Sequence, residues 1–196
     1  MTVQNAALEN SMRRYRAPDI PMSVIRRYAR QIAERFRPEK IVLFGSFAYG
    51  TPRVDSDVDL LVVMPSANTV SQAVRIRLAL RAPFPMDLLV RTPDNLQREL
   101  EQCNWFLREI VEKGKVLEFA VCLNLVEDEE SYDVVRYDTA HGPFHVHRYY
   151  VKDPSQQRED LPTRSLKAAL DEAIDDIEAN GERYMRSYRR NILGRK

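Results

Sequence analysis

Three aspartates in apolar surroundings are the first sign of chemistry in this chain. Asp57 and Asp59 begin the apolar run DVDLLVV at residues 57–63, and Asp87 stands alone in the segment FPMDLLV at 84–90. Side chains alternate along a strand, so Asp57 and Asp59 share a face, where their charges repel unless a cation lies between them. Mg²⁺ is bound by oxygen ligands, usually one or two carboxylates together with substrate phosphates. The acids therefore predict a site for a hard divalent cation.

The turn before these acids predicts a second part of the site. Residues 41–44 are four consecutive apolar residues, which is typical of a strand buried on both faces. Gly45 allows the backbone to turn sharply close to a bound group, and Ser46 is placed to cap a following helix, whose free amides suit a phosphate. Together with the carboxylates, this turn favours metal-assisted phosphoryl or nucleotidyl transfer. A plain turn before a strand also explains residues 55–57.

The order Gly45-Ser46, then Asp57-x-Asp59, then Asp87 in a later strand resembles the nucleotidyltransferase domain of the DNA polymerase beta superfamily. Within that superfamily the chain is most similar to the minimal nucleotidyltransferases of prokaryotes, which often act as antitoxins. Residues 45–60 carry most of the likeness, which extends over residues 20–120. The motif is fairly specific because three carboxylates, the Gly-Ser pair and the strand order must all agree.

The resemblance implies a role for each of these residues. Asp57, Asp59 and Asp87 are expected to be catalytic and to bind two Mg²⁺ ions, which stabilise the attacking and leaving oxygens of an in-line displacement. Gly45 and Ser46 are expected to bind the triphosphate of ATP. The implied reaction transfers AMP from ATP to a hydroxyl acceptor, and pyrophosphate leaves.

Tyr49 is a departure from the pattern of the resembled family. Many members carry an arginine at this place, so a nucleotide or acceptor contact made by that arginine is not expected here. Arg53, four residues further on, is our candidate for a phosphate contact in its stead.

The acceptor is a further implication of the resemblance. Minimal nucleotidyltransferases modify a protein, commonly a tyrosine of a partner HEPN toxin, so AMPylation in a toxin-antitoxin system is our first hypothesis. The second is a non-catalytic antitoxin that neutralises its partner, the product of a neighbouring gene, by contact alone. The third is an antibiotic nucleotidyltransferase, which needs an acidic pocket for a polycationic aminoglycoside. The sequence leaves the three open, and it leaves oligomerisation open as well.

The fold class expected is α+β (α/β), with three parts along the chain. Residues 1–20 are predicted to be a flexible polar arm. Residues 21–119 are predicted to be a polymerase-beta-like nucleotidyltransferase domain, with a mixed sheet and flanking helices. Residues 120–196 are predicted to form a small domain of antiparallel sheet and helix. In the second part, helices are expected from Ser23 to before Pro38, over 69–81 and, unbroken, from Pro93 to Gly114, and a short strand at 116–119 ends the domain.

The last 77 residues read as a meander followed by a helix. Strands are expected at 120–126, 132–137 and 144–151, because each apolar run is bounded by turn residues. A polar linker at 152–164 precedes a helix that begins near Leu166 and is interrupted at Gly181. The stretch 137–150 resembles, weakly, an uncharacterised prokaryotic domain found near toxin-antitoxin genes.

All three histidines lie in this last part of the chain, at His141, His145 and His147. On a strand, His145 and His147 share a face, and with His141 or Asp138 they would suit a transition metal. An exposed sheet face or an interface accounts for the same pattern equally well. Arg136 and His141 also match the spacing of a HEPN ribonuclease motif, but that motif belongs on a helix and here it falls at a strand end, so we interpret the match as accidental.

The amino-acid composition narrows the classes of partner, framework and cellular location that the sequence allows. With 30 basic and 29 acidic side chains the net charge is +1, so nothing in the overall charge favours nucleic acid or membrane as a partner. The two cysteines are isolated and indicate neither a disulfide framework nor a zinc cluster. No apolar run reaches the ~20 residues that cross a bilayer, and the start lacks the pattern of a signal peptide. A cytoplasmic location is expected.

Overall fold

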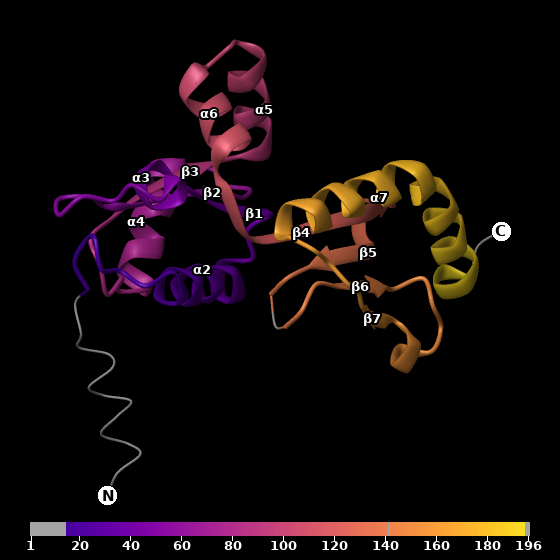
Figure 1. Ribbon diagram of the computed structural model, residues 1–196. Helices are drawn as coiled ribbons and strands as arrows, with labels where there is room; N and C mark the ends of the chain where they lie inside the picture. Colours follow the sequence, from indigo (N-terminus) through magenta and orange to yellow (C-terminus); the bar gives the residue numbers. More distant parts are fainter. Residues whose placement is uncertain (1–14, 141, 195–196) are drawn as a thin grey trace, which may run out of the picture. The chain divides into compact units, whose positions relative to one another are not determined.

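The computed structural model describes residues 15–140 and 142–194, and the chain divides into two compact units, Met1–Leu117 and Glu118–Lys196 (Figure 1). The elements of the first unit are α2 (Met22–Phe36), β1 (Lys40–Phe44), α3 (Gly45–Tyr49), β2 (Val58–Val63), α4 (Thr69–Ala79), β3 (Met86–Arg91), α5 (Pro93–Glu101) and α6 (Trp105–Lys113). Strand β4 (Lys115–Glu127) passes from the first unit to the second. The second unit continues with β5 (Glu130–Asp138), β6 (His145–Arg148), η1 (Pro154–Gln156), β7 (Arg158–Asp160), α7 (Leu166–Tyr188) and η2 (Arg189–Leu193).

The sheet is mixed, as the sequence predicts, with the strand order β3-β2-β1-β4-β5-β6-β7. In the first unit β1 and β2 pair antiparallel, whereas β2 and β3 pair parallel. Val42 and Phe44 of β1 pack in one core cluster with Leu107 and Ile110 of α6. Their neighbours Ile41 and Leu43 are fully buried too, so both faces of β1 are covered, which explains its continuous apolar run.

The helix predicted over 69–81 is confirmed as α4, although its apolar residues alternate as in a strand. Asn68 caps it, because its side chain accepts a hydrogen bond of 2.8 Å from the Ser71 amide. Ile76 is fully buried, whereas Val70 and Leu78 are exposed. The alternation therefore did not correspond to a buried face, and the cap was the more informative signal.

The single helix predicted from Pro93 to Gly114 is wrong, because the chain forms α5 and α6 there. Cys103 adopts a left-handed backbone conformation with φ of 60°, which ends the first helix. Asn104 then begins the second, since its side chain accepts a hydrogen bond of 3.2 Å from the Leu107 amide. The apolar stripe continues across the break, which is why periodicity alone predicted one helix.

The meander of the second unit is confirmed, with β4, β5 and β6 paired antiparallel in order. Two details differ from the prediction. The strands expected at 116–119 and 120–126 are one strand, β4, and the linker at 152–164 contains the short strand β7, which pairs with β6. All three residues of β7 are exposed, so it has no apolar pattern by which sequence could reveal it.

Helix α7 lies along the sheet of the second unit, and it runs through Gly181 without interruption (Figure 1). Gly181 is buried, and a Cβ atom on it would lie 3.5 Å from Leu123 Cδ2 of β4. The prediction of a break at Gly181 was therefore wrong. A Cβ atom there would make only an ordinary van der Waals contact with Leu123, so the helix tolerates this glycine at the cost of its low helix propensity.

Asp176 of α7 accepts hydrogen bonds from three side chains. The donors are the Tyr137 hydroxyl of β5 at 2.7 Å, the Tyr184 hydroxyl at 2.9 Å and the Asn180 amide at 3.0 Å. We expect Asp176→Ala to lower the free energy of unfolding by about 2–4 kcal/mol, because it leaves the hydroxyls of two buried tyrosines without their acceptor. Urea denaturation measures this, with the exposed neighbour Asp175→Ala as the control. Equal stability of the two variants would contradict this role.

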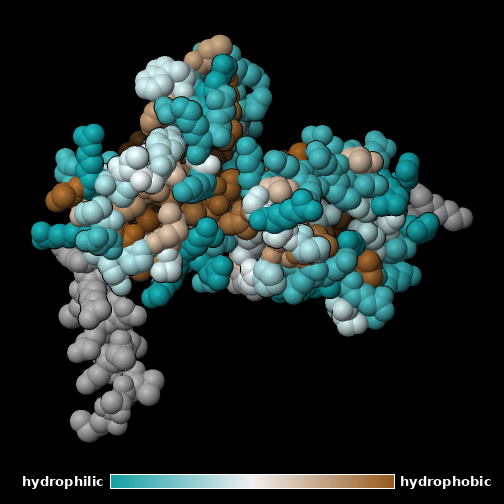
Figure 2. All heavy atoms as spheres, in the orientation of Figure 1, coloured by the Kyte–Doolittle hydropathy of each residue, from teal (hydrophilic) through white to brown (hydrophobic). Residues whose placement is uncertain are grey.

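Two further expectations concern the ends and the surface. Residues 1–14 of the predicted arm lie outside the described residues; of the rest, Ala17 and Ile20 are buried. Within the described part of the chain, no helix is both long enough and apolar enough to span a membrane. On the face shown in Figure 2, hydrophilic residues cover most of the second unit, with small hydrophobic areas between them.

Candidate functional site

Strand pairing places two of the predicted acids side by side. In the sheet register Asp59 of β2 is the partner of Asp87 on one side and of Phe44 on the other. Neighbouring strands lie about 4.8 Å apart, and paired residues of parallel strands project to the same face. Asp59 and Asp87 therefore come from different strands to one face of the sheet, although 28 positions separate them in the sequence.

Gly45 is adjacent to this pair because it directly follows Phe44. It has a φ of 65°, and a Cβ atom built on it would lie only 2.2 Å from Asp59 Oδ2. Both the left-handed backbone and the carboxylate require glycine here. Helix α3 begins at Gly45, with Phe44 in the N-cap position and no side-chain cap, so the expectation that Ser46 caps this helix is wrong.

A cavity of about 480 Å³ opens in front of the two acids. Gly45, Asp59 and Asp87 line it, and so do Arg77 of α4 and Glu109 of α6. Its apolar wall consists of residues from β1, β3 and α6, among them Phe44, Leu88, Leu89 and Phe106. This combination of an apolar wall with a few charged groups is typical of small-molecule sites.

The electrostatics of the cavity leave Asp59 in an unfavourable environment. Burial raises its pKa to about 6, and the negative charges of Asp87 and then Asp57 add to the effect. Arg77 offsets part of the charge of Asp87, since its Nη2 atom lies 3.5 Å from Asp87 Oδ1, but both side chains are largely exposed. A divalent cation beside Asp59 would relieve the repulsion.

The other predicted site residues lie apart from this cavity. Asp57 is exposed and lines a second cavity of about 570 Å³, together with Ser56 and Phe84. Arg53 is exposed in a turn, where its amide donates a hydrogen bond of 2.8 Å to Ser56 Oγ. Among the described residues, those that line the first cavity do not include Ser46, Arg53 or Asp57.

The carboxylates of Asp57, Asp59 and Asp87 are the type of ligand that Mg²⁺ prefers. All donors are carboxylate oxygens, and the raised pKa of Asp59, caused first by burial and then by the other two acids, marks an uncompensated charge. The three acids do not converge fully: among the described residues, they do not form a group whose oxygens all lie within 4.8 Å of one another. Asp59 and Asp87 are the two that share the cavity, and they would hold the ion.

Arg77 and Glu109 are the charged residues of the cavity that sequence reasoning missed. The arginines of α4 read as a solvated face, and Glu109 stands in an ordinary amphipathic helix. Neither has a motif around it. Their place in the site depends on how α4 and α6 pack on the sheet, so no local sequence signal marks them.

Comparison with known families agrees with the geometry. Residues 28–119 match the family model described as polymerase beta, nucleotidyltransferase, so this part of the chain is a nucleotidyltransferase domain of the polymerase beta superfamily. A second model, described as a domain of unknown function (DUF7718), matches residues 94–193, just over half of the chain. The chain belongs to this family.

Among solved structures, the chain is similar to the crystal structure of a "putative nucleotidyltransferase from Sulfolobus solfataricus". The identity is 18%, the match covers 59% of this chain and 89% of that chain, and the TM-score is 0.33. The search of curated proteins found no match.

Proposed function

We propose that this protein is a Mg²⁺-dependent nucleotidyltransferase that transfers AMP from ATP to a hydroxyl group of a protein, most specifically a tyrosine of a partner toxin in a toxin-antitoxin system. The observation that carries the proposal is the meeting of Gly45, Asp59 and Asp87 at one cavity. A backbone without a side chain beside two carboxylates leaves room for a phosphate chain and its cation.

The proposed step is an in-line displacement at the α-phosphorus of ATP. The acceptor oxygen forms a bond to phosphorus, the bond to the bridging oxygen breaks, and pyrophosphate leaves. Bound Mg²⁺ supplies stabilisation of the charge that develops on the phosphate oxygens. Asp59 and Asp87 would hold the ion, and Asp87, the more exposed of the pair, would accept the proton of the acceptor hydroxyl.

The apolar wall of the cavity supports a nucleotide as the ligand. The rings of Phe44 and Phe106 pack edge to face with centroids 5.8 Å apart, and both line the cavity. Aromatic faces at such a site suit the stacking of a nucleobase. Tyr49, which replaces the arginine of many relatives, also lines it and adds a further ring.

The direct test is label transfer from ATP. We expect label from [α-³²P]ATP, with Mg²⁺, to appear on the product of the neighbouring gene, whereas label from [γ-³²P]ATP leaves in pyrophosphate. Chelation of Mg²⁺ by EDTA and the double variant Asp59→Asn/Asp87→Asn should each abolish the transfer. Asp55→Asn, a change in an exposed turn, is the matched control and should transfer at the wild-type rate. Transfer that persists in the double variant would contradict this site.

Glu109 favours an aminoglycoside as a second candidate acceptor. It lines the same cavity as Asp59 and Asp87, and three acids in one cavity would attract a polycation. Parallel reactions with kanamycin in place of the protein distinguish the two acceptors.

The ion pair between Arg77 and Asp87 favours a third candidate, a non-catalytic antitoxin, because a cation of the protein already occupies one acid. Neutralisation of the partner without any label transfer, and unchanged in the double variant, would support contact alone.

A further inference from the structure

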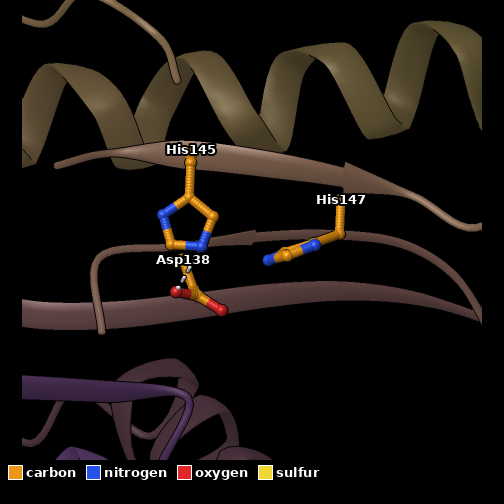
Figure 3. A group of neighbouring side chains, drawn as sticks. All are labelled: Asp138, His145 and His147. Atoms are coloured by element: carbon orange, nitrogen blue, oxygen red, sulfur yellow. Dashed lines mark ion pairs between the residues drawn. The ribbon is translucent and has the colours of Figure 1, made fainter. Parts of the chain in front are cut away.

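A second group of possible metal ligands lies in the second unit and shares no residue with the proposed nucleotidyltransferase site. Asp138 is the last residue of β5 and is the sheet partner of His145 in β6, and His147 follows two residues later on the same face. Figure 3 shows the three side chains converging from the two strands. One ligand atom from each lies within 4.8 Å of the other two, and no other group of three in the described residues does so.

Asp138 presents a buried oxygen that accepts no hydrogen bond from the described residues. The residue is only 3% exposed, and its Oδ2 atom accepts a hydrogen bond of 2.7 Å from Arg136 Nε. Its Oδ1 atom lies 3.2 Å from His145 Nε2, yet it has no partner in hydrogen-bonding geometry among the described residues. A buried carboxylate oxygen that accepts no hydrogen bond is costly, so this oxygen is well placed to bind a cation.

A hydrogen bond at Nδ1 determines which ring nitrogen of His145 carries the hydrogen. Its Nδ1 atom lies 2.8 Å from the Pro143 carbonyl oxygen, which can only accept, so Nδ1 carries the hydrogen. In the neutral ring, Nε2 then has a lone pair that faces Asp138 Oδ1. Two electron-rich atoms at 3.2 Å repel, unless a cation lies between them or the ring takes a second proton.

His147 completes the arrangement from the more open side. Its ring stacks on that of Tyr149 with centroids 5.7 Å apart and meets the ring of His145 edge to face at 4.9 Å. His145 is 1% exposed, whereas His147 is half-buried, so one side of the group remains open to a further ligand. The packing of its ring against Tyr149 and His145 thus orients His147, the most exposed of the three side chains.

We propose that Asp138 Oδ1, His145 Nε2 and a ring nitrogen of His147 bind one divalent transition-metal ion of the zinc type. Two imidazoles and one carboxylate select such a metal over Mg²⁺, and three protein ligands leave a fourth position open for water. Arg136 and the Pro143 carbonyl hold two of the ligands in place, as the outer partners of metal ligands usually do. The ion joins β5 to β6 and stabilises the second unit.

The test measures metal on the full-length protein after removal of metals by chelation and dialysis. We expect one equivalent of Zn²⁺ to bind in calorimetry, and Co²⁺ in its place to give the visible absorption of a four-coordinate ion. Zn²⁺ should also raise the melting temperature. Asp138→Asn and His147→Gln should each weaken Zn²⁺ binding by at least about 100-fold. His147 is half-buried, so its variant is the one expected to remain folded.

Two controls make the outcome decisive. Asp160→Asn makes the same chemical change on β7, where Asp160 is exposed, pairs with Arg158 and is not one of the three converging ligands, so this variant should bind Zn²⁺ as the wild type does. The double variant Asp59→Asn/Asp87→Asn should also bind one equivalent of Zn²⁺, because both substitutions lie in the first unit. Failure of the wild-type protein to bind Zn²⁺, or undiminished binding in folded His147→Gln, would overturn the proposal and leave a protonated His145 paired with Asp138.

Discussion

Asp59→Asn is expected to reduce nucleotidyl transfer by about 1,000-fold and, at the same time, to stabilise the fold. The loss follows because the amide would remove a charged ligand of the proposed Mg²⁺ ion. Stabilisation of the transition state by such an ion is worth several kcal/mol, and each 1.36 kcal/mol is tenfold in rate. Initial rates of transfer from [α-³²P]ATP at saturating Mg²⁺ measure it. Asp55→Asn is again the control.

The gain in stability follows from the raised pKa of Asp59. Burial, with the charges of Asp87 and Asp57, raises this pKa from 3.8 to about 6, so the folded state binds the proton more tightly than the unfolded state does. The free energy of unfolding must then fall as pH rises from about 4 to about 6, and the whole penalty is present at pH 7. Since the side chain is partly exposed, we expect the asparagine to recover about 1 kcal/mol at pH 7.

Urea denaturation at pH 4.5 and pH 7.5, without Mg²⁺, measures this difference. The stability of Asp59→Asn relative to wild type should be greater at the higher pH. Added Mg²⁺ should stabilise the wild type and leave the variant unchanged, since ligand binding to the folded state raises stability. A variant less stable than wild type at pH 7.5 would show that Asp59 is a structural residue and not a strained ligand.

Gly45→Ala is expected to damage both the fold and the site. The left-handed backbone at φ of 65° costs an alanine about 1–2 kcal/mol, and the new methyl group would stand 2.2 Å from Asp59 Oδ2, so the carboxylate must move. We expect a total loss of about 2–4 kcal/mol in the free energy of unfolding. Transfer of AMP should fall by at least about 100-fold even at temperatures at which the variant is folded.

Gly50→Ala separates the two causes. Gly50 also has a left-handed backbone, with φ of 78°, but a Cβ atom there would meet nothing within 4 Å. This variant should lose only the backbone part, about 1–2 kcal/mol, and keep its transfer rate once folded. If both alanine variants lose equal stability and both remain active, the contact between Gly45 and Asp59 has no part in the reaction.

The sequence alone was informative where a residue's chemistry conflicts with its surroundings. Gly45 after a buried strand, and Asp59 and Asp87 in apolar strands, predicted metal-assisted phosphoryl or nucleotidyl transfer, and the resemblance of their spacing to a known family indicated the nucleotidyltransferase class. The spacing of His145 and His147 placed them on one strand face, for which the sequence left a metal site open beside an exposed face or an interface. Helix caps such as Asn104 were present in the sequence as well, and an unbroken apolar stripe outweighed them.

Tertiary structure alone decided which side chains share a cavity. Strand register made Asp59 the neighbour of Asp87, and the packing of α4 and α6 brought in Arg77 and Glu109, while Arg53 stayed in an exposed turn. Register also set Asp138 opposite His145 and left one carboxylate oxygen without a partner. Local sequence encodes alternation, caps and turns, which act over a few residues. The meeting of side chains from separate elements depends on the sum of all packing contacts, and no short stretch of sequence contains that sum.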